Sequence, residues 1–340
     1  MILLQRSTGL RNWDPRFSLA IGNETNGGRP WQGDIYQLYI ADKAISPIEA
    51  QQIVHQNNAS SLLKDSLLVL YRFAVDTGQI HDETGLLPDF LWRGRRLTMP
   101  SPDVAFVSSD RWLETSGAAS ALVERIQKSS QFTLGVSVKT HDTDQIGPAR
   151  IVSFSLDANA RNFTLGQQNA DLIFRLRTPV TVLSDGGQSA LRVPGIFAQK
   201  KVQNLIITYD GARLVLYIDG IIYPKKFELS PGAAIFSLFI DSPLLWSQLC
   251  KFLYYASICV PLGIFVMLIT EITRGQIVKR ILVVSSGVVF ASVALESVLV
   301  ATSGKNWNTE SLLVSIAMAF GSIVLWEGYN VLRRGWKAAV

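Results

Sequence analysis

Short runs in which apolar and polar residues alternate fill the chain up to about residue 245. A period of two residues is typical of strands that bury one face, and turn pairs such as Asp210-Gly211 separate the runs. Only residues 46–56 and 118–129 have a helical pattern. The sequence therefore predicts an all-β sandwich, with strands at residues 17–21, 35–40, 67–73, 132–138, 151–156, 172–176, 205–209, 214–218 and 235–240.

Three long apolar stretches follow, at about residues 252–270, 281–301 and 311–332. A helix needs roughly 20 apolar residues to cross the hydrocarbon of a bilayer, so each stretch is long enough. Basic residues lie between the first two stretches and after the third, and the positive-inside rule places these regions in the cytoplasm. We therefore expect a three-helix α transmembrane region over residues 250–333, a lipid bilayer as partner, and the large domain outside.

A domain outside the membrane needs an export signal ahead of it. Residues 1–9 contain no apolar core of signal-peptide length. A folded domain of this size is a poor cargo for the first internal helix to translocate alone. We therefore expect a further transmembrane helix upstream of Met1. The alternative is that the domain stays inside and that the charge rule is broken.

The positive charge of the chain is concentrated near the carboxyl end. The chain has 32 Lys and Arg and 27 Asp and Glu, a net charge of +5. Eight of these basic residues but four of the acidic ones follow Gln248, so the excess belongs to the flanks of the apolar stretches. A nucleic-acid-binding protein carries a basic patch on its folded domain, so nucleic acid is not an expected partner.

Three segments of the β-rich part resemble elements of laminin-G-like, concanavalin A-like jelly rolls. Asn204-Leu-Ile-Ile-Thr-Tyr-Asp-Gly-Ala-Arg-Leu-Val-Leu-Tyr-Ile-Asp-Gly220 is similar to their central hairpin. Leu68-Val-Leu-Tyr-Arg-Phe73 is similar to their opening strand, and residues 29–46 to their closing strand with the short helix after it. The resemblance implies a jelly-roll sandwich with a lectin-like role.

These elements come in an unusual order, because the segment that resembles the closing strand precedes the others. Residues 1–63 are either the stump of a separate domain or part of one circularly permuted jelly roll that residues 64–245 complete. We favour permutation, because one copy of each element suffices and a sandwich tolerates permutation when its natural termini lie close together.

The apolar stretches resemble a second family. Tyr254-Tyr-Ala-Ser-Ile-Cys-Val-Pro-Leu-Gly263 is similar to the second helix of VanZ-like bacterial membrane proteins, and Glu296, Lys305 and Glu310 match that family's charged positions. The sequence departs from the family at Leu299, Val314 and Ala317. The resemblance implies a multi-pass protein of the bacterial cytoplasmic (inner) membrane, with a periplasmic domain, a cytoplasmic carboxyl terminus and a link to glycopeptide-antibiotic responses.

A polar cluster around Glu296 is the first candidate site. An ionisable residue within a membrane is costly and is usually paired. Lys305 is the expected partner, with Glu310 close by. The cluster is either a pocket for a lipid-linked or headgroup ligand or a structural ion pair at the water boundary.

Further candidate residues lie in the predicted sandwich. Four tryptophans are candidates for stacking on sugar rings, with packing in the core as the alternative: Trp13, Trp31, Trp92 and Trp112. Oxygens of Asn23, Glu24 and Asp34 are candidates for a calcium site, with turn capping as the alternative. Four arginines on or near strands are expected to be solvated charges on the surface: Arg150, Arg161, Arg175 and Arg177.

Signals of catalysis are few. Retaining glycoside hydrolysis needs two carboxylates about 5 Å apart, and the sequence lacks the Glu-x-Asp-x-x-Glu strand that would supply them. We therefore expect a membrane-anchored binding protein, rather than an enzyme, that recognises a cell-envelope glycan or protein through the sandwich. The alternative is a membrane enzyme or transporter-like unit that acts on a lipid-linked envelope precursor through the Glu296 cluster.

Overall fold

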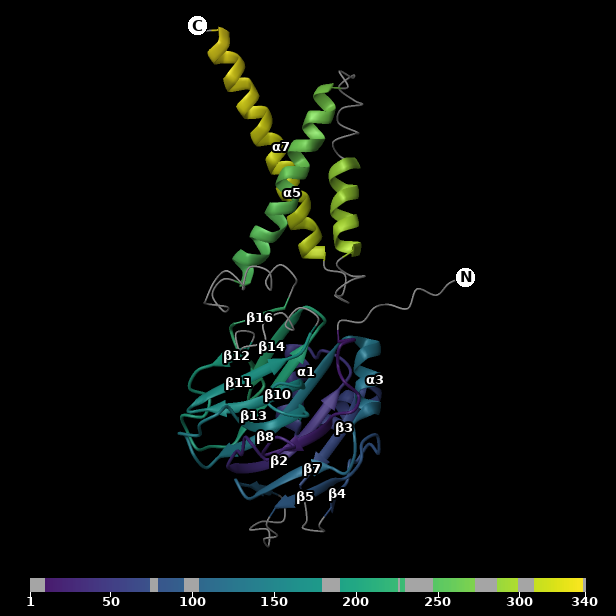
Figure 1. The fold of residues 1–340 in the computed structure, drawn as a ribbon, viewed down its shortest axis with the longest axis vertical. Coiled ribbons are helices and arrows are strands. Elements are labelled where there is room, and N and C mark those ends of the chain that lie inside the picture. The colour runs from purple at the N-terminus through teal and green to yellow at the C-terminus, as the bar shows by residue number, and fades with distance from the viewer. Residues whose placement is uncertain are drawn as a thin grey trace, which may run out of the picture. The chain divides into compact units, whose positions relative to one another are not determined.

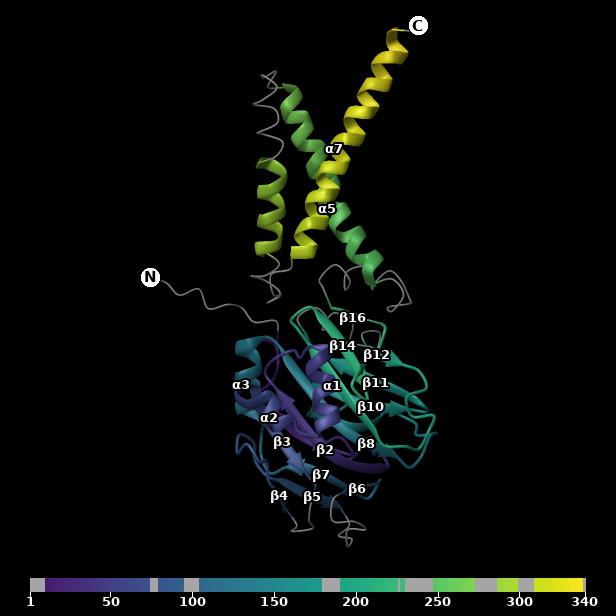
Figure 2. The ribbon, with the colours of Figure 1, turned by 180° about the vertical axis from the view of Figure 1, so that it is seen from behind.

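The computed structural model describes residues 10–73, 79–94, 104–178, 190–225, 227–229, 247–272, 286–298 and 309–338. The chain divides into two compact units. One unit is Thr8–Leu229, and the other is Ser230–Val340 together with Met1–Ser7. Figures 1 and 2 show the elements of both units from opposite sides.

The first unit is a β-sandwich of two antiparallel sheets, as the sequence predicts (Figure 1). Sheet A has the strand order β12-β11-β10-β9-β1-β7-β5-β4. Its strands are β1 (Ser18–Ile21), β4 (Gln79–Ile80), β5 (Phe90–Gly94), β7 (Arg111–Thr115), β9 (Ala149–Ser155), β10 (Arg161–Gln168), β11 (Asp171–Leu176) and β12 (Ala190–Val193).

Sheet B has the strand order β15-β14-β13-β8-β2-β3, with β6 beside β2 and β16 beside β14. Its strands are β2 (Gly33–Ala41), β3 (Leu67–Arg72), β6 (Ala105–Val107), β8 (Phe132–Thr140), β13 (Gln203–Tyr209), β14 (Arg213–Ile218), β15 (Ile221–Ile222) and β16 (Phe227–Glu228).

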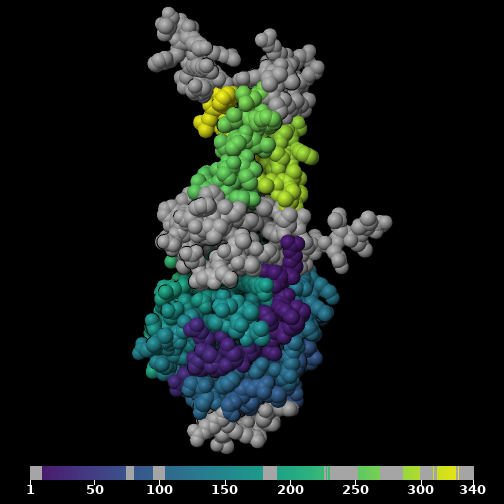
Figure 3. All heavy atoms as spheres, in the orientation of Figure 1, coloured from purple at the N-terminus to yellow at the C-terminus, as the bar shows by residue number. Residues whose placement is uncertain are grey.

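The beginning of the chain lies inside both sheets. In sheet A, β1 pairs with β7 on one side and β9 on the other. In sheet B, β2 pairs with β3 and β8. Figure 3 shows the same mixing at the surface, where purple atoms from early in the chain lie among teal and blue atoms from its middle. Residues of both predicted segments, 1–63 and 64–245, therefore contribute strands to the same two sheets.

Short helices border the sandwich: α1 (Pro47–Gln56), α2 (Ala59–Leu63), a 3-10 turn (Lys64–Ser66) and α3 (Ser120–Ser129). At the start of α1, Ser46 Oγ accepts a hydrogen bond from the Glu49 backbone N–H, and Glu49 Oε2 accepts one from the Ser46 N–H. This reciprocal capping satisfies two N–H groups that the helix leaves free, so the helix begins there. Both predicted helices are thus confirmed.

The predicted strands up to residue 218 are also confirmed, whereas the one at residues 235–240 lies outside the described residues. The main strand that the pattern misses is β10, which lies in the middle of sheet A. Its buried positions include Asn162, Thr164 and Gln167, so the apolar alternation that marks a strand is weak there.

An aromatic cluster joins the two sheets. Phe132 comes from β8 of sheet B, and Phe154 and Phe163 come from neighbouring strands of sheet A. The Trp13 ring lies 5.7 Å from that of Phe132 and 5.8 Å from that of Phe163, and its Nε1 donates to the Arg177 carbonyl at 2.8 Å. Tilted and edge contacts at this spacing are favourable, and the cluster fixes the separation of the sheets.

The second unit is helical. It contains α5 (Ser247–Ile272), a helix over residues 286–298 and α7 (Thr309–Ala338). These helices bury a common apolar cluster of Cys259, Met267, Val288, Ala319 and Ile323. A Cβ atom added at Gly263 would overlap Ser322 Oγ and the Ala319 carbonyl, so a glycine is required for the close approach of α5 and α7.

The expected membrane region is not borne out. No helix among the described residues is both long and apolar enough to cross a membrane. The expectation of three spans at residues 252–270, 281–301 and 311–332 is therefore wrong, as is the multi-pass inner-membrane location built on it. Hydropathy registers how apolar a run is, and it does not register that part of the apolar surface packs on neighbouring helices.

The aromatic cluster gives a first prediction. Phe163→Ala is expected to lower the free energy of unfolding by about 3–5 kcal/mol, because it leaves a cavity in a fully buried site. Leu156→Ala, at a side chain that is 59% exposed, is expected to change stability by less than about 0.5 kcal/mol. Urea unfolding followed by tryptophan fluorescence measures both, and equal losses would contradict this assignment of the core.

Candidate functional site

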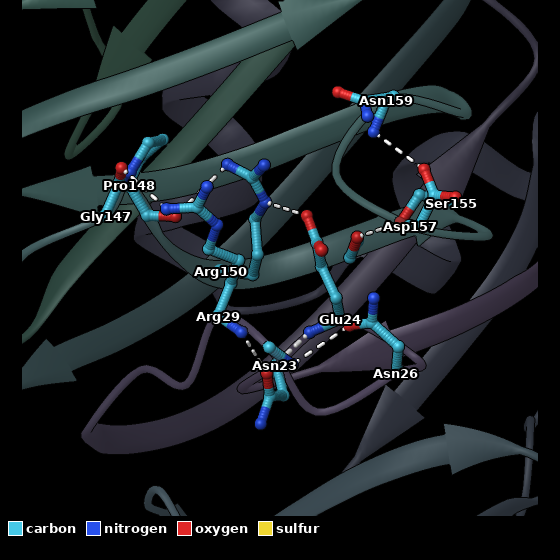
Figure 4. A network of polar contacts seen from close by, with 12 residues as sticks. Asn23, Glu24, Asn26, Arg29, Gly147, Pro148, Arg150, Ser155, Asp157 and Asn159 are labelled. Atoms are coloured by element: carbon cyan, nitrogen blue, oxygen red, sulfur yellow. Dashed lines mark hydrogen bonds and ion pairs between the residues drawn. The ribbon is translucent and has the colours of Figure 1, made fainter.

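The connection between β1 and β2, residues 22–32, forms a tightly bonded loop that we call the 22–32 loop. Asn23 Oδ1 accepts hydrogen bonds from the backbone N–H groups of Glu24 and Arg29, each at 2.9 Å (Figure 4). Thr25 Oγ1 donates to the Leu156 carbonyl at 2.8 Å. Since Leu156 follows directly on β9, these bonds hold the loop against sheet A.

The loop carries Glu24 into a buried ion pair with Arg150 of β9. Glu24 Oε1 lies 2.8 Å from Arg150 Nε, and both side chains are 1% exposed (Figure 4). Arg150 also donates to the Pro148 carbonyl at 3.2 Å. Burial lowers the pKa of Arg150 from its ordinary value, and the charge of Glu24 opposes that shift. Each charge therefore depends on the other to remain stable away from water.

Strand register shows which face of sheet A this pair occupies. Phe154 and Phe163 point into the core, so their neighbours Ser153 and Thr164 point to the outer face. Thr164 lies opposite both Ser153 and Arg175, so these three residues form one row across β9, β10 and β11. The outward-facing side of sheet A therefore carries a row of two buried hydroxyl side chains that ends at the partly exposed Arg175.

Positive charge gathers on this outer face. Arg150 lies opposite Gly166 in the neighbouring strand, and Arg29 of the 22–32 loop donates to the Gly147 carbonyl at 3.0 Å (Figure 4). The pKa of Arg175 is lowered to about 10, first by burial and then by the charges of Arg150, Arg161 and Arg29. Among the described groups that shift the pKa of Arg175, Glu24 supplies the one opposing charge.

Several buried polar atoms near this face have no hydrogen-bond partner among the described residues: Asn23 Nδ2, Glu24 Oε2, Trp112 Nε1 and Arg175 Nε. The orientation of the Asn23 amide follows from its bonds, because its oxygen accepts two backbone N–H groups and its nitrogen is left without an acceptor. Unpaired buried donors and acceptors are uncommon, and they mark positions that water or a ligand group completes.

The four candidate tryptophans differ in burial. Trp13 and Trp31 lie in the core at 3% and 0% exposure, where Trp31 Nε1 donates to Gln167 Oε1 at 2.8 Å. Trp92 of β5 is partly exposed, and the Arg111 guanidinium lies 3.9 Å from the centre of its ring. Trp112 of β7 is also partly exposed, and it lies beside Gly27 of the 22–32 loop.

The residues considered for calcium have other partners. Asn23 caps the 22–32 loop, and Glu24 pairs with Arg150. Asp34 Oδ2 lies 2.8 Å from His141 Nε2. In the part of the chain that the structure describes, no three His, Cys, Asp or Glu residues are grouped to hold a metal ion. The geometry therefore follows the alternative of turn capping for Asn23.

The structure describes the Glu296 cluster only in part. Glu296, in the helix of residues 286–298, is 1% exposed, and Tyr255 Oη donates to its Oε2 at 3.3 Å. Lys305 lies outside the described residues, and only the backbone of Glu310 is described, within α7. The predicted Glu296–Lys305 pair therefore stays a prediction.

Sequence reasoning missed the arginines as a group. Arg150 was expected to be a solvated surface charge, and its burial shows that expectation to be wrong. A signal was present, because arginines recur at residues 150, 161 and 175 on strands that carry few acidic residues. The 22–32 loop, whose Glu24 pairs with Arg150, is more than a hundred residues away in sequence.

Comparison with known proteins does not assign the chain to a family. Family models, curated proteins and solved structures contain no match to it. The resemblance to laminin-G-like jelly rolls therefore stays a prediction, and the site must be interpreted from its own geometry.

The buried ion pair gives a second prediction. Glu24→Gln is expected to lower the free energy of unfolding by about 3–5 kcal/mol, because Arg150 stays buried without its counter-charge. The double variant Glu24→Gln/Arg150→Met removes both charges and is expected to be more stable than Glu24→Gln alone. Urea unfolding of the three proteins measures this.

Arg16→Gln is the matched control, because it breaks the pair between Asp14 and an Arg16 side chain that is 85% exposed. Exposed pairs contribute little, so its unfolding curve is expected to overlay that of the unmodified protein. If Glu24→Gln were as mild as this control, the buried pair would not be holding the 22–32 loop.

Proposed function

We propose that the sandwich, residues 8–229, is a ligand-binding domain of the lectin-like, laminin-G-like kind, and that it recognises a glycan through the outer face of sheet A. The observation that carries this proposal is that Arg175 and Trp112, both partly exposed, lie on that face, while Ser153 and Thr164 between them are buried. Ligand sites combine a few placed polar groups with aromatic surface, and Trp112 supplies the latter.

Trp112 lies on the same outer face as this row. Its neighbour Leu113 is fully buried in the core, so Trp112 points away from the core. The 22–32 loop reaches it, because a Cβ at Gly27 would lie 3.4 Å from the indole. A partly exposed guanidinium on β11 and a partly exposed indole on β7, four strand spacings apart on one face, suit an oligosaccharide, whose hydroxyls and C–H faces need both kinds of contact.

Binding without catalysis fits the carboxylates of this face. Glycoside hydrolysis uses two carboxylates that flank the scissile bond. Glu24 is instead buried and paired with Arg150 at 2.8 Å, and Glu114, which lies opposite Ala20 on the same face, is paired with Arg93 at 3.0 Å. The competing idea of an enzyme or transporter at Glu296 depended on a membrane unit, and the described helices do not include one that crosses a membrane.

Two tryptophans on neighbouring strands provide the test. Trp112→Ala is expected to weaken glycan binding about tenfold, which corresponds to about 1.4 kcal/mol. Trp92→Ala is the matched control, because Trp92 lies opposite Leu113 and so belongs to the inner face. A glycan array followed by titration calorimetry with the purified chain measures the loss.

The control is expected to bind its glycan within about twofold of the unmodified protein. Absence of binding to every glycan on the array would overturn the proposal. So would turnover of a bound glycan, or a protein ligand in place of a glycan.

A further inference from the structure

Arg175 differs from the other arginines of the outer face in having no hydrogen bond from its side chain to any described residue. Its Nε is buried without a partner, although Arg150 bonds to Glu24 and Arg29 bonds to Gly147. A guanidinium carries five N–H donors, and a partly buried one normally satisfies them. Arg175 is therefore a charged donor group with unused capacity.

The groups around Arg175 are mostly positively charged. Burial first, and then the charges of Arg150, Arg161 and Arg29, lower the pKa of Arg175 to about 10. With that pKa the group is still charged at neutral pH, so like charges remain crowded on this face. Glu24 offsets them only in part, because it supplies the one opposing charge among the described groups that shift the pKa of Arg175. An anion placed at Arg175 would relieve the repulsion and supply the missing acceptors.

Arg192, on the neighbouring strand β12, is an arginine that does have a carboxylate partner. It lies opposite Ile173 on β12, two residues along β11 from Arg175, and on the same outer face. Its guanidinium lies 2.7 Å from Asp171 Oδ2. The two arginines therefore share a sheet face and a charge but differ in whether a carboxylate partner is present.

We propose that Arg175 is the anchor of an anion subsite on the outer face of sheet A, so that the glycan bound there is acidic and carries a carboxylate or a sulfate ester. This inference rests on the proposed function, because it names the class of glycan that the same face recognises. Two oxygens of a carboxylate, or two of the three terminal oxygens of a sulfate ester, can accept side by side from the forked N–H donors of a guanidinium, which Lys would not reproduce.

The experiment compares matched ligands with the full chain. The probes are an oligogalacturonate, the same oligosaccharide as its neutral methyl ester, a sulfated oligosaccharide, and inorganic sulfate alone. Titration calorimetry is expected to show at least one acidic oligosaccharide binding about tenfold or more tightly than the neutral ester. That preference is expected to shrink as salt is raised, because the contact is between charges.

Two variants assign the effect to one residue. Arg175→Gln is expected to weaken binding of the acidic oligosaccharide about tenfold and to leave any weak binding of the neutral ester unchanged. Arg192→Gln removes the same charge from the same face and is expected to change neither affinity by more than about twofold. Equal losses in the two variants would show a diffuse charge effect and would overturn the subsite.

Thermal unfolding without ligand distinguishes a binding role of Arg175 from a structural one. Removing Arg175 relieves repulsion, so the Tm of Arg175→Gln is expected to be equal to or above that of the unmodified protein. A clear fall in Tm would mean that Arg175 serves the fold, and it would overturn the inference.

The outcomes also separate this inference from the proposed function. If the neutral ester binds as well as the acidic oligosaccharides and Arg175→Gln is silent, the anion subsite fails while the glycan-binding face stands. If no oligosaccharide binds but inorganic sulfate does so through Arg175, the anion subsite stands and the glycan-binding function fails. If neither the oligosaccharides nor sulfate bind, both are overturned.

Discussion

The buried ion pair between the Glu24 carboxylate and the Arg150 guanidinium fixes the 22–32 loop on the outer face of sheet A. Glu24 and Arg150 meet at 2.8 Å beneath the 22–32 loop. An ion away from water is stable only where a counter-charge and hydrogen bonds replace its hydration. The pair therefore permits essentially one placement of the loop, in which Asn23 caps the turn and Thr25 reaches the end of β9. The remaining features of the face follow from that placement.

The pair also determines where unbalanced charge remains. The single charge of the Glu24 carboxylate, which is paired with Arg150, only partly offsets the positive charges around Arg175 on β11. Ser153 and Thr164, in the row next to the pair, are buried at 0% and 1% exposure, whereas Arg175 at the end of that row is partly exposed. A buried ion pair on one side and, on the other, an arginine without a carboxylate partner among the described residues make this face chemically asymmetric, and asymmetry of this kind orients a ligand.

Much of the fold was accessible from local patterns. Alternating apolar residues identified β2, β8 and β13, which lie in the middle of sheet B and bury one face against the core. The Ser46-Pro47 start predicted α1. The pattern failed at β10, whose buried positions are largely polar because their partners are other buried polar groups. It failed again over the apolar stretches, since hydropathy does not tell protein packing from a lipid environment.

The candidate site was accessible only as a set of unconnected residues. Asn23, Glu24 and Trp112 were recognised as candidates one by one, while Arg150 and Arg175 were taken for surface charges. By itself the sequence determined the period-two pattern, the turns and the caps, because these depend on residues close together along the chain. The tertiary structure alone decided that Glu24 is buried against Arg150 and that the Nε of Arg175 has no partner among the described residues. Both facts depend on register between strands and on a loop more than a hundred residues away in sequence, and electrostatic energy depends on distance in space rather than on position in the chain.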